Sequence, residues 1–277
     1  MVLTSIIVCC IIGNFFGIFG ASSFIFSYKI LPEIRNRSRL FILTLSICNI
    51  ICEISGLLPG YKNTHLCTAQ CFLINWIFIA CFCWIFMISL IYYLQICRNF
   101  DIENSPKFYW FSNLFVQLFS LLHGILAVTL GKPKSGASYW CFISDKNVEI
   151  FHYSTIWFFL ISTLILYSLV VHKIRKDKDI NYPKSFQIKM LTLATLYIIT
   201  ELSLFIKKMT QIFKKDYSPN EFVDAFEAFF TPLLGFWDFV FFVVGDKFVR
   251  ALLIRKFKKK KSQDVIELNQ GLISFEN

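Results

Sequence analysis

The sequence is poor in charged residues. Asp, Glu, Lys and Arg make up 17% of its 277 residues, whereas a soluble globular domain carries roughly 25%. These charges lie in clusters, and the stretches between the clusters stay apolar for 17 to 26 residues. An α-helix of about 20 apolar residues crosses the hydrocarbon core of a bilayer. The composition therefore argues against a soluble domain and indicates an α-helical protein with several membrane spans.

The sequence also lacks the short motifs of common enzymes. It contains no HExxH, no GxSxG and no GxxxxGK[ST], which are patterns of zinc peptidases, serine hydrolases and phosphate-binding loops. The four histidines, at positions 65, 123, 152 and 172, lie far apart along the chain, so no metal site is expected. We expect His123, the only one well inside an apolar run, to be a hydrogen-bonded structural residue. The last apolar run has no Lys before Lys247, so a retinal Schiff base has no candidate there. The sequence thus predicts no enzyme activity, no metal and no cofactor.

No linker rich in Pro, Gly or Ser and no internal repeat divides the chain. The predicted fold class is an all-α membrane protein, with a seven-transmembrane helix bundle over residues 1–245. A cytoplasmic amphipathic helix and a basic tail are expected over residues 246–277. The sixth apolar run is the shortest, and Glu201 interrupts it. The seven runs are Ser5–Tyr28, Leu40–Leu58, Cys71–Ile96, Phe108–Leu130, Phe151–His172, Met190–Ile206 and Phe222–Val244.

The basic residues predict the orientation in the membrane. Of the 28 Lys and Arg, 20 lie after the first, third, fifth and seventh runs, and 8 lie in the other loops. Cytoplasmic loops are enriched in Lys and Arg, so the N-terminus is expected outside and the tail inside. The glycosylation sequon at Asn36 then falls on the cytoplasmic side, where it would stay unused. The net charge is +10. We expect the basic residues to set the membrane orientation and to contact anionic lipid, rather than to bind nucleic acid. The plasma membrane is the expected location.

Three cysteines lie near the predicted outer surface, where the environment is oxidising. They are Cys67 and Cys71, at the start of the third run, and Cys141, in the loop before the fifth run. A disulfide between the third span and this loop would hold the loop over the bundle. The residues themselves leave the choice between Cys67 and Cys71 open.

Acidic residues inside the apolar runs form a predicted polar seam. A charged side chain at the bilayer centre costs ~2.5–3.5 kcal/mol on insertion scales, so such residues normally face the bundle interior. Glu53 lies within two turns of the outer surface, and Asp238 lies deep in the last run. Asp224 and Glu227 lie near the outer end of that run, where an interfacial position is an equal alternative. Glu227 and Asp238 are 11 residues apart, which places them on one face of a regular helix.

The end of the last run carries two further signals. Pro232 and Gly235 predict a kink, because Pro removes a helix hydrogen bond. The segment 246–261 alternates apolar and basic residues and ends in Lys258–Lys261. This pattern predicts an amphipathic helix on the inner membrane surface.

Four motifs in the right order resemble one receptor family. They are FFGIFGASSFIFSYKILPEIRNRSRLFILTLSICNI (Phe15–Ile50), CTAQCFLINWIFIACFCWIFMISLIYYLQI (Cys67–Ile96), YWCFI (Tyr139–Ile143) and PLLGFWDFVFFVVG (Pro232–Gly245). They are similar to the first two spans, the third span, the second outer loop and the seventh span of the cyclic-AMP-receptor-like receptors of social amoebae, the class E G-protein-coupled receptors. The fourth and sixth runs match this family poorly.

The resemblance implies a receptor that transduces an unknown extracellular ligand to heterotrimeric G proteins. The family's C-x-x-Q pattern favours Cys67 as the partner of Cys141. Where the family has Asp in helix two and Asn in helix seven, this chain has Asn49 and Asp238, which looks like a reciprocal exchange. A ligand site is expected along Asn49 and the polar seam. The inner ends of the helices would face the G protein, with Arg98, Lys173, Arg175 and Lys176 as contributors.

The chain also departs from receptor patterns. The Asp-Arg-Tyr motif of rhodopsin-like receptors is absent from the end of the third run, and the sixth run contains no Pro. Nothing in the motifs implies that the ligand is cyclic AMP. The main alternative is an ion or small-solute transporter, in which Glu53, Glu227 and Asp238 line a path. No inverted repeat supports that alternative. A membrane scaffold without signalling is a third possibility.

Overall fold

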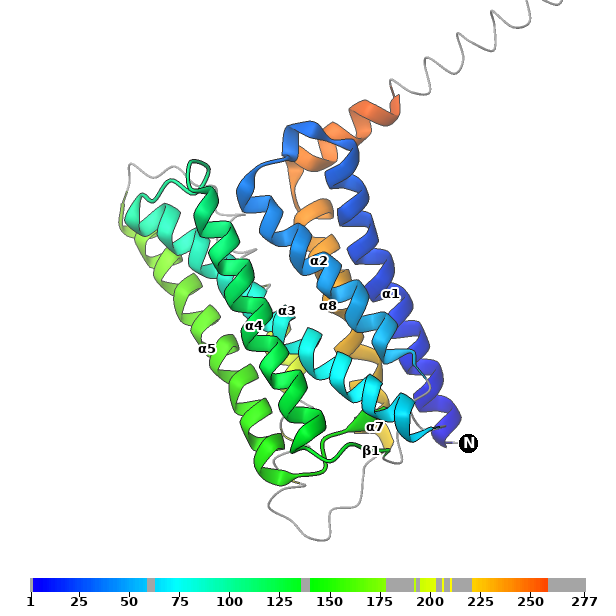
Figure 1. Ribbon diagram of the computed structural model, residues 1–277. Helices are drawn as coiled ribbons and strands as arrows, with labels where there is room; N and C mark the ends of the chain where they lie inside the picture. Colours follow the sequence, from blue (N-terminus) through cyan, green and yellow to red (C-terminus); the bar gives the residue numbers. More distant parts are fainter. Residues whose placement is uncertain are drawn as a thin grey trace, which may run out of the picture.

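The computed structural model describes residues 2–58, 63–135, 140–177, 192, 195–202, 206, 210 and 221–258. Long helices run side by side in a bundle (Figure 1). The end that holds the N-terminus is called the outer end here, and the opposite end is the inner end. The elements are α1 (Val2–Ile30), η1 (Pro32–Ile34), α2 (Arg37–Gly56), α3 (Thr64–Arg98), α4 (Pro106–Thr129), β1 (Lys134–Ser135), β2 (Cys141–Phe142), α5 (Lys146–Lys176), α7 (Glu221–Phe230), η3 (Thr231–Leu233), α8 (Leu234–Phe239) and η4 (Val240–Val244).

Five of the described helices, α1 to α5, are long and apolar enough to cross a membrane. They coincide with the first five predicted runs. The last predicted run is a broken segment, because a 3-10 turn separates α7 from α8 and a π turn follows α8. Ala228–Val244 and the helix Lys247–Lys258 form a bent pair with an angle of 77°. Part of the sixth predicted run lies outside the described residues, and residues 195–202 are helical.

The helices extend beyond the apolar runs because polar caps, rather than hydrophobicity, set where they begin. The third helix begins at Thr64, where Asn63 Oδ1 accepts a hydrogen bond from the His65 backbone N–H at 2.7 Å. The fifth begins at Lys146, where the Asp145 carboxylate accepts from the next backbone N–H groups. The predicted runs mark only the parts of these helices that lie in apolar surroundings.

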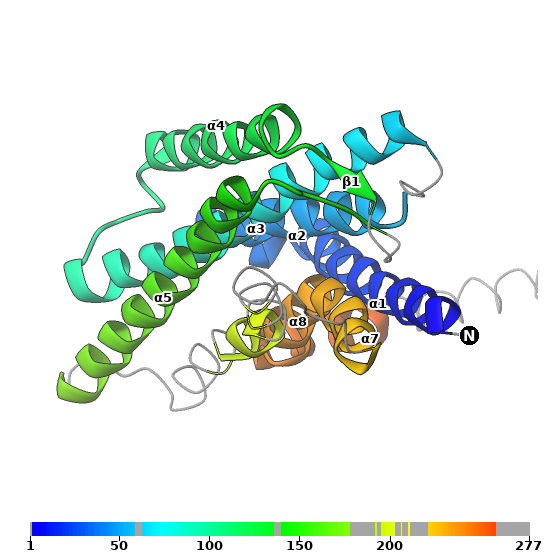
Figure 2. The ribbon, with the colours of Figure 1, turned by 90° about the horizontal axis from the view of Figure 1, so that it is seen from below.

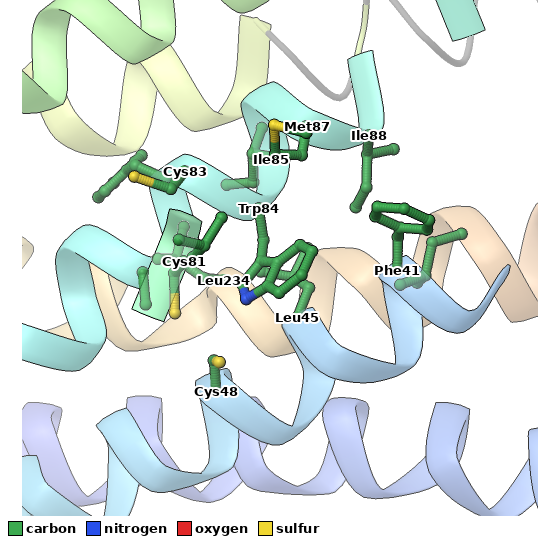
Figure 3. Packing of buried hydrophobic residues seen from close by; sticks show 14 of the residues in the cluster. Phe41, Leu45, Cys48, Cys81, Cys83, Trp84, Ile85, Met87, Ile88 and Leu234 are labelled. Atoms are coloured by element: carbon green, nitrogen blue, oxygen red, sulfur yellow. The ribbon is translucent and has the colours of Figure 1, made fainter. Parts of the chain in front are cut away.

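Helix α3 runs through the middle of the bundle and packs against α2, α4 and α5 (Figure 2). Its most apolar stretch is 72% buried, more than in any other described span. The indole of Trp84 is fully buried and reaches from α3 toward Leu45 and Cys48 of α2 (Figure 3). It also meets the ring of Phe41 edge-on, with centroids 5.7 Å apart. Large apolar side chains of α1, α4 and α5 that point away from the bundle are exposed, as expected for helices that face lipid.

Helix α1 lies in backbone contact with the last segment of the bundle. A Cβ atom on Gly20 would come within 2.5 Å of the Gly235 carbonyl oxygen, and one on Gly13 would come equally close to the Phe229 carbonyl oxygen. A Cβ on Gly17 would collide with the Pro232 carbonyl oxygen. Small residues at such spacings allow membrane helices to approach closely. The glycines of α1 therefore place the 3-10 turn and α8 against the first helix.

Polar contacts close the inner end. Asn36 Oδ1 caps α2 by accepting from the Arg39 backbone N–H at 2.8 Å, so this sequon residue has a structural role. The Glu103 carboxylate also accepts from backbone N–H groups at the start of α2, including that of Arg37 at 2.9 Å. Arg39 forms a 3.0 Å ion pair with Asp246, directly before the helix Lys247–Lys258. The inner loop, α2 and the last helix are thereby joined.

The helix Lys247–Lys258 has an apolar face, as the sequence predicted. Val249 is 1% exposed, and Leu252 and Leu253 pack against the main core. Phe248 and Phe257 are exposed, at 54% and 55%. Residues 259–277, which include most of the predicted Lys258–Lys261 cluster, lie outside the described residues.

Candidate ligand cavity and buried polar cluster

The loop between α4 and α5 is fixed to the outer end of α3. Cys67 and Cys141 form a disulfide, with their Cα atoms 5.4 Å apart. The expected bond between the third span and this loop is confirmed, and Cys67 is the partner. Cys71 is a free, buried cysteine one turn further along α3. Next to the disulfide, β1 and β2 pair antiparallel and shape the loop.

Gln70 adds a second attachment of the same loop. Its Oε1 accepts a hydrogen bond of 3.0 Å from the Cys141 backbone N–H, and its Nε2 donates to the Leu58 carbonyl at 2.7 Å. Trp140 Nε1 donates to the Gly56 carbonyl at 2.9 Å. The loop is therefore held to α3 by a covalent bond and to the end of α2 by hydrogen bonds. Cys67 and Gln70 thus both contact Cys141.

A cavity lies beneath this loop, between α1, α2, α3, α5 and the start of the last segment. Its walls enclose about 860 Å³ of space, including the mouth. The lining residues are Asn14, Asn49, Cys52, Glu53, Gly56, Ile74, Asn75, Phe78, Trp140, Cys141, Ile143, Glu149, His152, Tyr153, Thr231, Pro232 and Leu234.

Two residues of the predicted polar seam belong to this wall. Glu53 is 4% exposed and Asn49 is 1% exposed, and both come from the inward face of α2. Thr231 and Leu234, from the start of the last segment, also line the cavity. The described acidic residues of the wall are Glu53 and Glu149. The cavity is thus mostly apolar, with a few convergent polar groups, which is typical of small-molecule sites.

Asp238 lies deeper than the cavity floor and is fully buried. Asn49 Nδ2 donates to Asp238 Oδ2 at 2.8 Å, and the Tyr197 hydroxyl donates to Asp238 Oδ1 at 2.7 Å. Both carboxylate oxygens therefore have a donor, which offsets the cost of removing the group from water. The expected contact between Asn49 and Asp238 is present. The three residues join α2, the helical stretch 195–202 and α8.

Comparison with solved structures finds the same arrangement of helices in a known protein. The crystal structure of squid rhodopsin is similar to this chain with a TM-score of 0.76, at 12% sequence identity. The alignment covers 93% of this chain and 84% of that chain. No protein-family model and no curated protein matches the sequence.

The protein has the seven-transmembrane-helix fold. It is a multi-pass membrane protein, and the fold class predicted from the apolar runs is confirmed. In this architecture, the outer cavity and the buried Asp238 cluster occupy the interior of the bundle. At 12% identity the similarity to squid rhodopsin shows the fold alone.

The basic residues expected to face a G protein lie at the inner ends of α3 and α5. Arg98 is exposed at the end of α3, 5.9 Å from the centre of the Tyr93 ring. Lys173 forms an ion pair of 3.2 Å with Asp177, one turn further along the chain. Arg175 and Lys176 are exposed. The two helix ends are held together by an apolar cluster that includes Ile96, Val170 and Ile174.

Three further sequence predictions concern the acidic residues of α7, their spacing from Asp238, and His123. Asp224 and Glu227 lie on α7, but their side chains are outside the described residues. A 3-10 turn separates Glu227 from Asp238, so the three regular helical turns assumed for their spacing are not present. The expectation of a hydrogen-bonded His123 is wrong within the described part of the chain. His123 Nε2 has no hydrogen-bond partner there, and its ring stacks on Phe151 with centroids 4.8 Å apart.

Sequence reasoning missed two contributors to these sites. Tyr197 lies in the weakest apolar run, and a single Tyr there gave no sign that it donates to Asp238. Gln70 had no predicted role beyond its place in a motif, although it links the outer loop to α2. The spacing of Gly13, Gly17 and Gly20 was a usable signal, since small residues at helical spacing indicate a close helix contact.

Proposed function

We propose that the protein is a G-protein-coupled receptor that binds an extracellular ligand in the outer cavity and activates a cytoplasmic heterotrimeric G protein. The observation that carries the proposal is the double role of Asn49. Its side chain lines the cavity, and it also donates a hydrogen bond to the buried Asp238. Asp238 in turn accepts from Tyr197 in a different helix. A ligand in contact with Asn49 would act directly on this link between helices.

A receptor of this kind has at least two arrangements of its bundle, and the ligand favours the one that it binds more tightly. A buried polar cluster suits such a switch, because a change in one hydrogen bond leaves a desolvated group without a partner. The 3-10 turn at Thr231–Leu233 lies between the cavity and Asp238. It interrupts the regular α-helix of the last segment beside the cavity, which Thr231 and Pro232 help to line.

At the inner end, Arg98, Lys173, Arg175 and Lys176 are proposed to contact the G protein. The support is their position on two adjacent helix ends, where Arg98, Arg175 and Lys176 are exposed. We also propose that the chain is a divergent member of the class E cyclic-AMP-receptor-like receptors. The Cys67 and Gln70 contacts with Cys141 give a structural reason for one of the motifs that resemble this family.

The test is nucleotide exchange on purified G proteins. The full chain in lipid nanodiscs is mixed with heterotrimers of each main G-protein class, and binding of a non-hydrolysable GTP analogue is followed without added ligand. We expect basal exchange on at least one heterotrimer to rise by about two- to tenfold, because unliganded receptors populate the active arrangement to a small extent. Substitution of Arg98, Arg175 and Lys176 by Ala together should remove this rise.

The matched control replaces Lys146, Lys132 and Lys134, at the outer end, by Ala and should leave exchange unchanged. Two results together would favour the transporter alternative over the receptor. The protein would stimulate nucleotide exchange on none of the heterotrimers, and it would conduct ions across liposome membranes in an assay in which the Asp238→Asn variant is inactive.

A further inference from the structure

We propose that the outer cavity binds ligands that carry a protonated amine, and that the ammonium group of the ligand pairs with Glu53. This inference rests on the proposed receptor function and names the chemical class of its ligand. Three features of the cavity carry it: a buried carboxylate with no donor among the described residues, a set of asparagine oxygens left as acceptors, and described lining residues that include no Lys or Arg.

Glu53 is buried without any compensating group that the structure describes. It is 4% exposed and lines the cavity. None of the described residues donates a hydrogen bond to its carboxylate or forms an ion pair with it. On its other side the carboxyl group lies against α1, where a Cβ on Gly17 would be 3.0 Å from Glu53 Oε1. A buried carboxylate without a donor is costly, so the charged form of Glu53 gains from a cationic partner in the cavity.

The asparagine amides of the wall donate to groups within the protein. Asn14 Nδ2 donates to the Cys10 carbonyl at 2.7 Å, and Asn75 Nδ2 donates to the Cys71 carbonyl at 2.7 Å. Asn49 Nδ2 donates to Asp238. Asn14 Nδ2 and Asn75 Nδ2 make their second contacts with Cys10 Sγ and Cys71 Sγ, at 3.2 and 3.4 Å, whereas Asn49 keeps a second N–H. None of the three amide oxygens accepts a hydrogen bond from a described residue, so all three are available as acceptors. An ammonium group carries three donors and no acceptor, which matches a wall that offers acceptors from three helices.

The charges and rings of the wall favour the same ligand. Among the described lining residues there is no Lys or Arg, while Glu53 and Glu149 are acidic. The phosphate of a nucleotide ligand would therefore meet two carboxylates and no described cation. Phe78, Trp140 and Tyr153 add aromatic surface, which attracts cations at distances up to ~6 Å. An amine with an aromatic body would fill the apolar part of the cavity and place its charge at Glu53.

The first experiment measures the apparent Tm of the full chain, purified in detergent, with three probes of similar size. The probes are 2-phenylethylamine, 2-phenylethanol and 3-phenylpropionate, each at millimolar concentration. They share a phenyl ring on a two-carbon tether and differ in carrying a cation, a hydroxyl group or a carboxylate. We expect the amine to raise the Tm by about 2–4 °C, the alcohol by less, and the carboxylate not at all. Equal shifts for the three probes, or the largest shift for the carboxylate, would overturn the proposal.

The second experiment repeats the measurement on Glu53→Gln, with Glu149→Gln as the matched control. The Glu53 variant should lose the shift with the amine and keep the small shift with the alcohol, whereas the control should respond like the parent protein. Without a probe, Glu53→Gln should be at least as stable as the parent, because an unpaired buried carboxylate is removed. A large loss of stability would mean that Glu53 already has a structural partner. Loss of the amine shift in Glu149→Gln instead would assign the anchor to the other acid.

These outcomes are independent of signalling. The Tm shifts need no G protein, so a protein that binds the amine but fails to stimulate nucleotide exchange would refute only the receptor function. A protein that stimulates exchange but shows no preference for the amine would refute only the ligand class.

Discussion

The side-chain amide of Asn49 on α2 donates a 2.8 Å hydrogen bond to the carboxylate of Asp238 on α8, and both side chains are buried. The two residues are 189 positions apart in the chain. Their contact brings the second and last spans together at the level where the cavity ends. Since the carboxylate also accepts from Tyr197, its replacement affects three helical segments at once.

The first prediction is a reciprocal exchange of this pair. Asn49→Asp alone should place two carboxylates in contact and lower the apparent Tm strongly, while Asp238→Asn alone should cost less, since two amides still form a neutral hydrogen bond. The double exchange restores one carboxylate and one amide and should recover most of the loss. A double-mutant cycle should give a coupling energy of about 1–3 kcal/mol. Additive losses would show that the two side chains do not interact, and basal nucleotide exchange should follow the same pattern as stability.

The second prediction compares two buried tyrosines. Tyr197→Phe removes a donor from Asp238 and should destabilise the protein by about 1–3 kcal/mol. Tyr167 is equally buried, but its hydroxyl has no hydrogen-bond partner among the described residues. Tyr167→Phe is therefore the matched control and should leave the apparent Tm unchanged or slightly raised. Equal losses in both variants would mean that the Tyr197 hydroxyl contributes nothing specific.

The third prediction concerns the disulfide. Cys141→Ala or Cys67→Ala should lower stability by about 2–4 kcal/mol and reduce surface expression, because the loop over the cavity loses its covalent bond. Cys71→Ala changes a free cysteine one turn away and should have a smaller effect. Non-reducing peptide mapping of the parent protein should recover a Cys67–Cys141 peptide. Recovery of a Cys71–Cys141 peptide would contradict the pairing.

The fourth prediction tests the close contact of α1 with the last segment. Gly20→Ala adds a methyl group 2.5 Å from the Gly235 carbonyl oxygen, so the helices must separate. We expect a loss of about 1–3 kcal/mol, as for overpacked cores, and a lower yield of folded protein. Ser22 is exposed on the same helix, and Ser22→Ala should have little effect. A tolerated Gly20→Ala would show that the two backbones can move apart without cost.

Much of the fold could be predicted because the bilayer imposes simple rules. Five long apolar runs became the five membrane-spanning helices α1 to α5, and the outer cysteines became a disulfide. Helix ends were less predictable, since they depend on local caps such as Asn63 and Asp145. The last run was the hardest, because Pro232 predicted a kink but not the 3-10 turn and the π turn.

The candidate site could be predicted only in part. The sequence singled out Asn49, Glu53 and Asp238, because polar side chains in apolar runs are costly and usually have a partner or a function. Tyr197 and Gln70 did not, since neither residue type is unusual at such a position. The environment of His123 was predicted wrongly, because a sequence does not show whether a hydrogen-bond acceptor or an aromatic ring will lie beside an imidazole.

The glycine contact between α1 and the last segment has a consequence for biogenesis. A chain inserted from its N-terminus exposes the grooved face of α1 to lipid until the final span has left the ribosome, because the partner of Gly13, Gly17 and Gly20 lies more than 200 residues later. The contact of α1 with this segment therefore forms only after the segment has been synthesised. A quality-control factor that recognises an unmatched groove in the membrane would hold this protein for as long as its last span is absent or mispaired.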